Sequence, residues 1–204
     1  MSSGEIYRAP AGQAWGEWRD RGSRFLAWVQ PAIDEIQAQE LLKRARERFP
    51  DATHHCFAWR LGDPPQERSS DDGEPHGTAG RPILTVLAGA DISDVSAVVM
   101  RWFGGVKLGK GGLARAYSGA VSRALEGLPI EEKVPRVEIE VTLPYDRFGA
   151  LERLIHPPQV AIIEQAFDAQ VSVRLAVWRS EELAVRGALA DAGIEIGPGP
   201  SARS

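Results

Sequence analysis

VMRWFGGVKLGKGGLARAYSGAV, residues 99–121, joins an apolar segment to a helical pattern through a run of glycines. The β-branched, apolar segment Val95–Phe103 predicts a strand that is buried on both faces. From Leu113 to Leu125, apolar residues recur at helical spacing until Gly127 ends the pattern. Five glycines lie in the connection Gly104–Gly112, so the chain is expected to turn tightly from a buried strand into a helix.

The residues before this stretch predict a further helix and two further strands. Apolar residues 25–29 indicate a buried strand, and Asp34 is expected to cap a helix with Gln37 as its capping-box partner. Residues 53–60 indicate another strand. The glycine- and proline-rich residues 62–80 predict a long loop. The segment 82–87 fits a helix or a strand, and the first twenty residues show no clear pattern.

After the helix, residues 131–135 are interpreted as a linker, and the pattern changes. Residues 137–143 alternate strictly between apolar and polar, as expected for a strand with one wet face. A helix near 146–156, strands at 160–165 and 171–177, and a helix capped by Ser180 complete a β-α-β-β-α order. This order is typical of a ferredoxin-like sandwich.

The chain is therefore expected to be an α+β protein with two domains. The predicted domains are residues 1–133 and 134–197, and residues 198–204 are expected to form a disordered tail. Predicted wet positions on the second sheet are polar and lack aromatic rings: Glu138, Glu140, Thr142, Ser172 and Arg174. An RNA-recognition sheet would carry aromatic residues there, so this face looks unsuited to base stacking.

Composition limits the possible functions. The chain has 204 residues, a formal net charge of −4 and a sequence pI near 5.6, which disfavour a globally basic nucleic-acid binder. No apolar run is long enough for a transmembrane helix, and the N-terminus lacks an apolar secretory core. The single cysteine, Cys56, can form neither an internal disulfide nor a cysteine-based zinc cage, so a reducing cytoplasm is expected.

The glycine connection is the main candidate site. Glycine amides and a helix N-terminus together attract anions, and basic residues surround them here. The segment nearly matches two nucleotide motifs, but Gly111 stands where a phosphate loop needs Ser or Thr, and no acidic residue follows at the ribose position. The alternative is that the glycines serve only tight packing. The predicted anion or nucleic-acid site comprises Arg101, Gly104, Gly105, Lys107, Gly109, Lys110, Gly111, Gly112 and Arg115.

An acidic segment is expected at the edge of this site. Asp71, Asp72, Glu74 and His76 lie within six residues, separated by turn-forming Gly and Pro. They could form a solvated turn, bind a cation or do acid–base work, and a calcium-loop pattern is missing. If the loop folds back, its carboxylates could pair with Lys107, Lys110 or Arg101. No catalytic residue, metal site or cofactor is predicted, and His54 with Cys56 is interpreted as a core pair.

Three ordered blocks carry a resemblance to a known family. The blocks ATHHCFAW (52–59), SSDDGEPHGTAGRPIL (69–84) and the stretch 99–121 resemble the IMPACT/YigZ family over roughly residues 23–125. Trp102 stands where Tyr is usual, Lys110 where Thr or Ser is frequent, and His55 where Asn is common.

The resemblance implies both a fold and a role. It implies a ribosomal-protein-like α/β sandwich, similar to domain IV of elongation factor G, followed by a domain similar to domain V of that factor. Eukaryotic members regulate translation during amino-acid starvation by competing for an activator of a stress kinase. The chain has the layout of the bacterial members, so this competition is not expected to carry over whole.

Three functions follow as hypotheses. The leading one is a non-enzymatic, cytoplasmic regulator of translation that binds RNA or the ribosome through the glycine connection, with a protein partner in translation control also possible. The second is an enzyme for a small phosphorylated or anionic substrate, with Asp72 or His76 in acid–base roles. The third is a protein-interaction module anchored by Trp102, Phe103 and Tyr117, provided that they are exposed.

Overall fold

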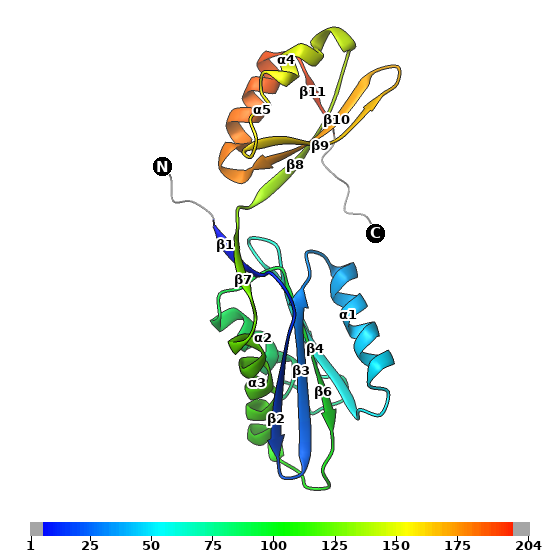
Figure 1. The fold of residues 1–204 in the computed structure, drawn as a ribbon, viewed down its shortest axis with the longest axis vertical. Coiled ribbons are helices and arrows are strands. Elements are labelled where there is room, and N and C mark those ends of the chain that lie inside the picture. The colour runs from blue at the N-terminus through cyan, green and yellow to red at the C-terminus, as the bar shows by residue number, and fades with distance from the viewer. Residues whose placement is uncertain (1–5, 198–204) are drawn as a thin grey trace. The chain divides into compact units, whose positions relative to one another are not determined.

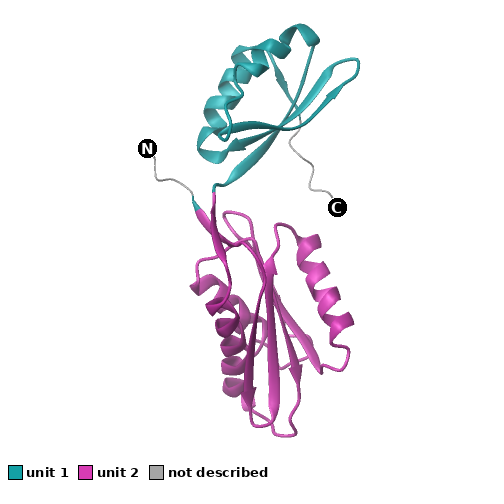
Figure 2. Cartoon of the chain, viewed as in Figure 1, with its two compact units in different colours: residues 1–6, 134–204 teal, residues 7–133 magenta. Residues whose placement is uncertain are grey.

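The computed structural model describes residues 6–197, which fall into two compact units (Figure 2). The first unit comprises residues 7–133, and the second comprises residues 134–197 together with residue 6. The predicted tail, residues 198–204, lies outside the described residues. Among the helices described, none is long and apolar enough to cross a bilayer. The architecture confirms the predicted α+β class.

The first unit is built on a five-stranded antiparallel sheet in the order β2-β3-β6-β4-β5 (Figure 1). Its strands are β2 (Ala14–Asp20), β3 (Ser23–Pro31), β4 (His54–Leu61), β5 (Gln66–Ser70) and β6 (Val95–Trp102). A separate two-stranded ribbon pairs β1 (Tyr7–Pro10) with β7 (Ile130–Lys133). The central strand β6 is buried along almost its whole length, as its apolar sequence predicts.

Helices cover the two faces of this sheet unequally. Helices α2 (Gly80–Gly89) and α3 (Gly109–Glu126) pack on one face and enclose the main apolar core. Of the helices that the structure describes, α1 (Glu35–Arg48) alone covers the other face (Figure 1). The predicted cap of α1 is confirmed, because the Gln37 N–H donates to Asp34 Oδ1 at 2.8 Å.

The second unit has a four-stranded sheet in the order β11-β8-β10-β9. Its elements, in chain order, are β8 (Arg136–Leu143), 3₁₀ helix η1 (Tyr145–Arg147), α4 (Phe148–Glu152), β9 (Val160–Phe167), β10 (Val171–Trp178), 3₁₀ helix η2 (Arg179–Glu181), α5 (Glu182–Asp191) and β11 (Glu195–Ile196). The predicted β-α-β-β-α order is present, with the short strand β11 added. Arg174 on the polar face lies 3.6 Å from Glu138 and also contacts Glu164.

Several local predictions were wrong. The predicted loop 62–80 contains strand β5, whose polar residues lie at an exposed sheet edge and give no apolar signal. The predicted linker 131–135 overlaps β7, whose partner strand is more than 100 residues away. The predicted helix at 146–156 ends at Glu152. Ser180 does not cap α5, because it lies inside a 3₁₀ turn and its side chain makes no cap hydrogen bond.

Candidate functional site

The glycine connection is a loop that continues directly into α3. Its last four residues, Gly109–Gly112, already form the first turn of the helix, so the predicted turn is shorter than expected. Gly105 and Gly109 have φ angles of 86° and 72°, which favour glycine. A Cβ at Gly104 would lie 1.9 Å from the carbonyl carbon of Gly22, so the loop packs closely on the β2–β3 turn.

The start of α3 is positively polarised and carries no acidic residue. Leu108 occupies the N-cap position and provides no side-chain hydrogen bond to the first turn. Lys107, Lys110 and Arg115 are exposed, and none of them has an ion-pair partner among residues 6–197. We call these three side chains, with the amides of Gly109–Gly112, the basic loop. Exposed cations beside free helix amides can bind an anion such as phosphate.

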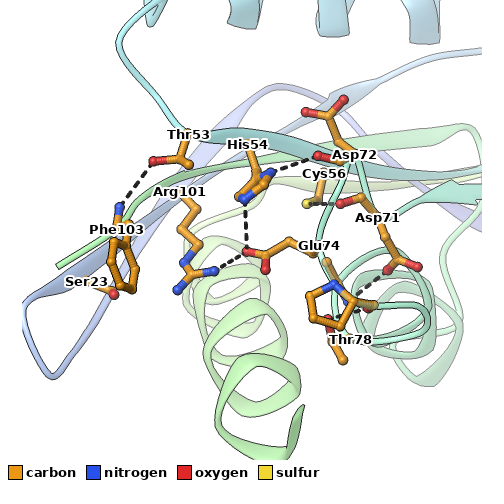
Figure 3. Close-up of polar contacts among 12 residues, drawn as sticks. Ser23, Thr53, His54, Cys56, Asp71, Asp72, Glu74, Thr78, Arg101 and Phe103 are labelled. Carbon is orange, nitrogen blue, oxygen red and sulfur yellow. Dashed lines mark hydrogen bonds and ion pairs between the residues drawn. The ribbon is translucent and has the colours of Figure 1, made fainter. Parts of the chain in front are cut away.

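Arg101 does not belong to the basic loop, which corrects the prediction. Its side chain is only 7% exposed, and its guanidinium forms an ion pair with Glu74, which is 3% exposed (Figure 3). The Arg101 Nε atom is also buried and has no hydrogen-bond partner among residues 6–197. A buried arginine neutralised by a carboxylate cannot supply its charge to a ligand on the surface.

Glu74 is the centre of a buried polar cluster. The Tyr117 hydroxyl donates to Glu74 Oε1 at 2.7 Å, and the Cys56 thiol donates to the Tyr117 oxygen at 3.3 Å. The Cys56 thiol also lies 3.0 Å from the Asp71 carbonyl oxygen. Burial raises the pKa of Cys56, and burial together with Cys56 and Glu74 raises the pKa of Tyr117. Both groups therefore remain protonated and act as hydrogen-bond donors.

His54 joins the acidic segment to this cluster. Its Nδ1 atom lies 2.8 Å from the Asp72 carbonyl oxygen, so Nδ1 carries the proton. Its Nε2 atom faces Glu74 Oε1 at 3.9 Å (Figure 3). The core pairing predicted for His54 and Cys56 is partly correct, since both side chains lie on the inner side of β4, but each bonds to the acidic segment and not to the other.

Asp71 anchors the N-terminus of α2. Its carboxylate accepts hydrogen bonds from the backbone N–H groups of Gly77, Ala79 and Gly80, at 2.8–3.0 Å. Burial by itself would raise the pKa of Asp71, but these three donors outweigh it and hold the pKa below its usual value. The carboxylate thus satisfies helix amides that would otherwise lack partners.

Asp72 supports the backbone of β4. Its Oδ2 atom accepts from the His55 N–H at 2.7 Å, and its Oδ1 atom accepts from Arg46 at 3.0 Å. These bonds explain why Asp72 tolerates a positive φ of 41°. A carboxylate held in this way is an anchor, which disfavours the acid–base role considered for it.

The acidic segment meets the predicted site at one point only. Glu74 pairs with Arg101, whereas Asp71 and Asp72 bond to other partners, and within residues 6–197 no carboxylate of the segment pairs with Lys107 or Lys110. The exposed His76 lies 3.8 Å from Asp71. No group of three or more His, Cys, Asp or Glu side chains in the described chain is arranged to hold a metal ion.

The aromatic residues considered as partner anchors differ in exposure. Tyr117 is fully buried, so the exposure on which its role as an anchor depends is absent for this residue. Trp102 is half-buried, and Phe103 is 48% exposed. The Phe103 N–H lies 3.3 Å from Thr53 Oγ1, which fixes the chain where the glycine connection begins (Figure 3).

Comparison with known proteins places this site in a family. The Impact N-terminal domain matches residues 21–125, which contain both the basic loop and the Glu74 cluster. IMPACT family member YigZ of Escherichia coli is 36% identical over 172 residues, covering 83% of this chain and 84% of that protein. The chain belongs to the IMPACT family. IMPACT family member YvyE of Bacillus subtilis is 35% identical, over 78% of this chain and 74% of YvyE.

A solved structure of similar fold is also known. The crystal structure of a hypothetical protein is 33% identical, with a TM-score of 0.75, and the likeness covers 94% of this chain and 96% of that one. The fold of this chain is therefore also found in a protein whose crystal structure has been solved. The resemblance seen in the three sequence blocks is confirmed as family membership.

Proposed function

We propose that this IMPACT family protein is a non-enzymatic, translation-associated regulator that binds RNA or the ribosome through the basic loop. Family membership supports the translation-associated part of the proposal. The direct contact with RNA is supported by the basic loop itself. We place this activity in the cytoplasm.

The observation that carries the proposal is the unneutralised charge at the start of α3. Lys107, Lys110 and Arg115 are exposed and have no carboxylate partner among residues 6–197, although the whole chain is acidic. Gly109–Gly112 form the first turn of the same helix, so their backbone amides lack intrahelical acceptors, and the helix dipole adds positive potential there. Gly104, Gly105 and Gly109 set the shape of the loop, so their packing role and an anion-binding role are compatible.

Co-sedimentation with ribosomes tests the proposal. The purified chain would be mixed with ribosomes and centrifuged through sucrose at about 50 mM and about 200 mM salt. Each phosphate contact releases counterions, so binding through the loop is expected to fall steeply over this range. The Lys107→Ala/Lys110→Ala variant is expected to lose most of its co-sedimentation at the lower salt.

A charge-matched control separates the loop from general electrostatics. Lys43→Ala/Arg153→Ala removes two exposed positive charges elsewhere in the chain and should sediment like the unmodified protein. Equal losses in both double variants, or retention of binding in the Lys107/Lys110 variant, would overturn the assignment to the basic loop. Absence of co-sedimentation at both salts would overturn ribosome binding.

A further inference from the structure

A second surface of the first unit combines aromatic rings with arginines. It lies on the sheet face that α1 covers alone, over β2, β3 and the end of β6. We call it the arginine–tryptophan face. Its members are Trp15, Trp28, Phe49, Trp102, Arg24, Arg44 and Arg48.

The rings of this face contact one another directly. Trp15 stacks on Trp28 with ring centroids 4.5 Å apart and planes 22° apart. Phe49 meets Trp15 edge-on at 6.1 Å and Trp102 edge-on at 5.8 Å. Three of the four rings, those of Trp15, Phe49 and Trp102, are only half-buried. The fourth, Trp28, is buried, with 5% of its surface exposed. The rings therefore form a continuous aromatic strip that reaches solvent.

A guanidinium lies over each tryptophan of the strip. Arg24 lies 4.8 Å from the ring centroid of Trp102, and Arg48 lies 5.1 Å from that of Trp15. Arg44 lies 5.0 Å from the ring centroid of Trp28. Each of these guanidinium groups thus lies within the range of a cation–π contact with its ring.

The charge of this face is only partly balanced. Arg24 forms an ion pair with Glu17 at 3.0 Å, and Arg44 donates to the amide oxygen of Gln30. In the part of the chain that the structure describes, neither Arg44 nor Arg48 has a carboxylate partner. A half-buried aromatic strip beside unneutralised cations matches an anionic ligand that has planar groups.

We propose that the arginine–tryptophan face binds single-stranded RNA, whose bases stack on the rings and guanidinium planes while its phosphates meet the arginines. Stacking of this kind tolerates any base, because every base has a π face. Duplex RNA would not fit, since its bases are already stacked inside the helix. The inference rests on the proposed function, because it assigns the bases of the same RNA to a second surface.

The position of Trp102 connects this face with the basic loop. Trp102 ends β6, and Lys107 follows five residues later, so their Cα atoms lie at most about 18 Å apart. One strand of RNA can therefore touch both surfaces. An acidic protein segment is the competing occupant, but its carboxylates have no aromatic face to stack on the tryptophan rings, so the aromatic strip favours RNA.

Binding of labelled oligonucleotides tests this inference. The probes are an unstructured RNA of about ten nucleotides and an abasic strand with the same backbone. Binding of each probe is measured by fluorescence anisotropy at low salt. Trp15→Leu and Trp102→Leu are each expected to weaken binding of the complete RNA about tenfold and to leave binding of the abasic strand unchanged. Arg48→Gln, an exposed substitution that spares the rings, should weaken binding of the complete RNA.

The structure provides matched controls on the opposite face of the same strand. Trp18 is also half-buried on β2, and the guanidinium of Arg123 lies 4.8 Å from its ring, but it packs against α3. Trp18→Leu and Arg123→Gln should therefore bind both probes as the unmodified chain does. A cooperative thermal unfolding transition confirms that each variant is folded, since loss of a packed tryptophan lowers the melting temperature by itself.

The outcomes separate this inference from the proposed function. If the complete and abasic strands bind equally and only Lys107→Ala/Lys110→Ala matters, the aromatic face is overturned and the basic loop stands. If neither probe binds, the inference is overturned, whatever the ribosome sedimentation shows. Poly-glutamate is also tested in place of RNA. If it quenches the tryptophan fluorescence of the unmodified chain but not that of Trp15→Leu, the occupant is an acidic protein and the inference is also overturned.

Discussion

The hydroxyl of Tyr117 on α3 donates a hydrogen bond to the carboxylate of Glu74 at 2.7 Å, although 43 residues separate them in the chain. The same carboxylate neutralises Arg101 on β6. One acidic side chain therefore ties the acidic segment to a strand and a helix behind the basic loop. The most acidic motif of the sequence is in this way largely structural.

Loss of the Glu74 carboxylate should destabilise the first unit strongly. In Glu74→Ala, Arg101 stays buried without a counter-charge and Tyr117 loses its acceptor, so the free energy of unfolding should fall by about 3–5 kcal/mol. Urea denaturation measures this loss. Glu47→Ala is the control, because Glu47 is exposed and pairs with Lys43 at 4.0 Å, and it should cost less than about 1 kcal/mol. Equal losses in the two variants would refute the structural role.

Asp71 should make stability depend on pH. Its folded-state pKa lies below the unfolded value of about 3.9, so its contribution is complete above that value and is lost as the pH falls through the folded-state pKa. Asp71→Asn should therefore cost about 1–2 kcal/mol at pH 7. The difference from the unmodified chain should shrink between pH 5 and pH 2, as followed by urea titration. A difference that stays constant across that range would contradict the charged cap on α2.

Two glycines of the connection should respond oppositely to alanine. A Cβ at Gly104 would lie 1.9 Å from the carbonyl carbon of Gly22 and 2.2 Å from the Ser23 nitrogen, so Gly104→Ala should cost about 1–3 kcal/mol. Gly111 lies in the first turn of α3, and among residues 6–197 a Cβ there would meet no atom within 4 Å beyond its chain neighbours and the backbone of its own helix. Gly111→Ala should be neutral or stabilise by up to about 1 kcal/mol. Thermal unfolding compares the two, and a destabilised Gly111→Ala would count against this packing.

Cys56 should be unreactive in the folded protein. Burial raises its pKa, and only the thiolate reacts quickly with a disulfide reagent. At pH 8, labelling by Ellman's reagent should be much slower in buffer than in about 6 M urea, where the thiol is exposed. Absorbance of the released thiolate follows both rates. Fast labelling of the folded chain would show that the Glu74 cluster opens to solvent.

Short-range features of the fold could be predicted from the sequence. The cap of α1 depends on Asp34 and Gln37, three residues apart, and the structure contains that hydrogen bond. The burial of β6 and the helical spacing of α3 follow from apolar patterns a few residues long. The cations Lys107, Lys110 and Arg115 are exposed at the start of α3, although their role stays a prediction.

These local patterns do not predict which residues, distant in the sequence, come together in the fold. A lone arginine usually lies in water, and Arg101 is buried only because Glu74, 27 residues earlier, folds back beside it. Strands β5 and β7 are short and polar, so they form only because each pairs with a neighbouring strand. The partner of β7 is β1, which lies at the opposite end of this unit in the sequence. Trp15, Trp28 and Trp102 share no local sequence pattern, so the sequence does not indicate that they lie on one face.

The sequence by itself therefore determined the cap of α1, the buried strand β6, the helix α3 and the family. Only the tertiary structure decided which charges are neutralised and which rings meet. Periodicity and capping act between residues three or four apart, whereas pairing of Glu74 with Arg101 and stacking of Trp15 on Trp28 depend on how distant strands register in the sheet.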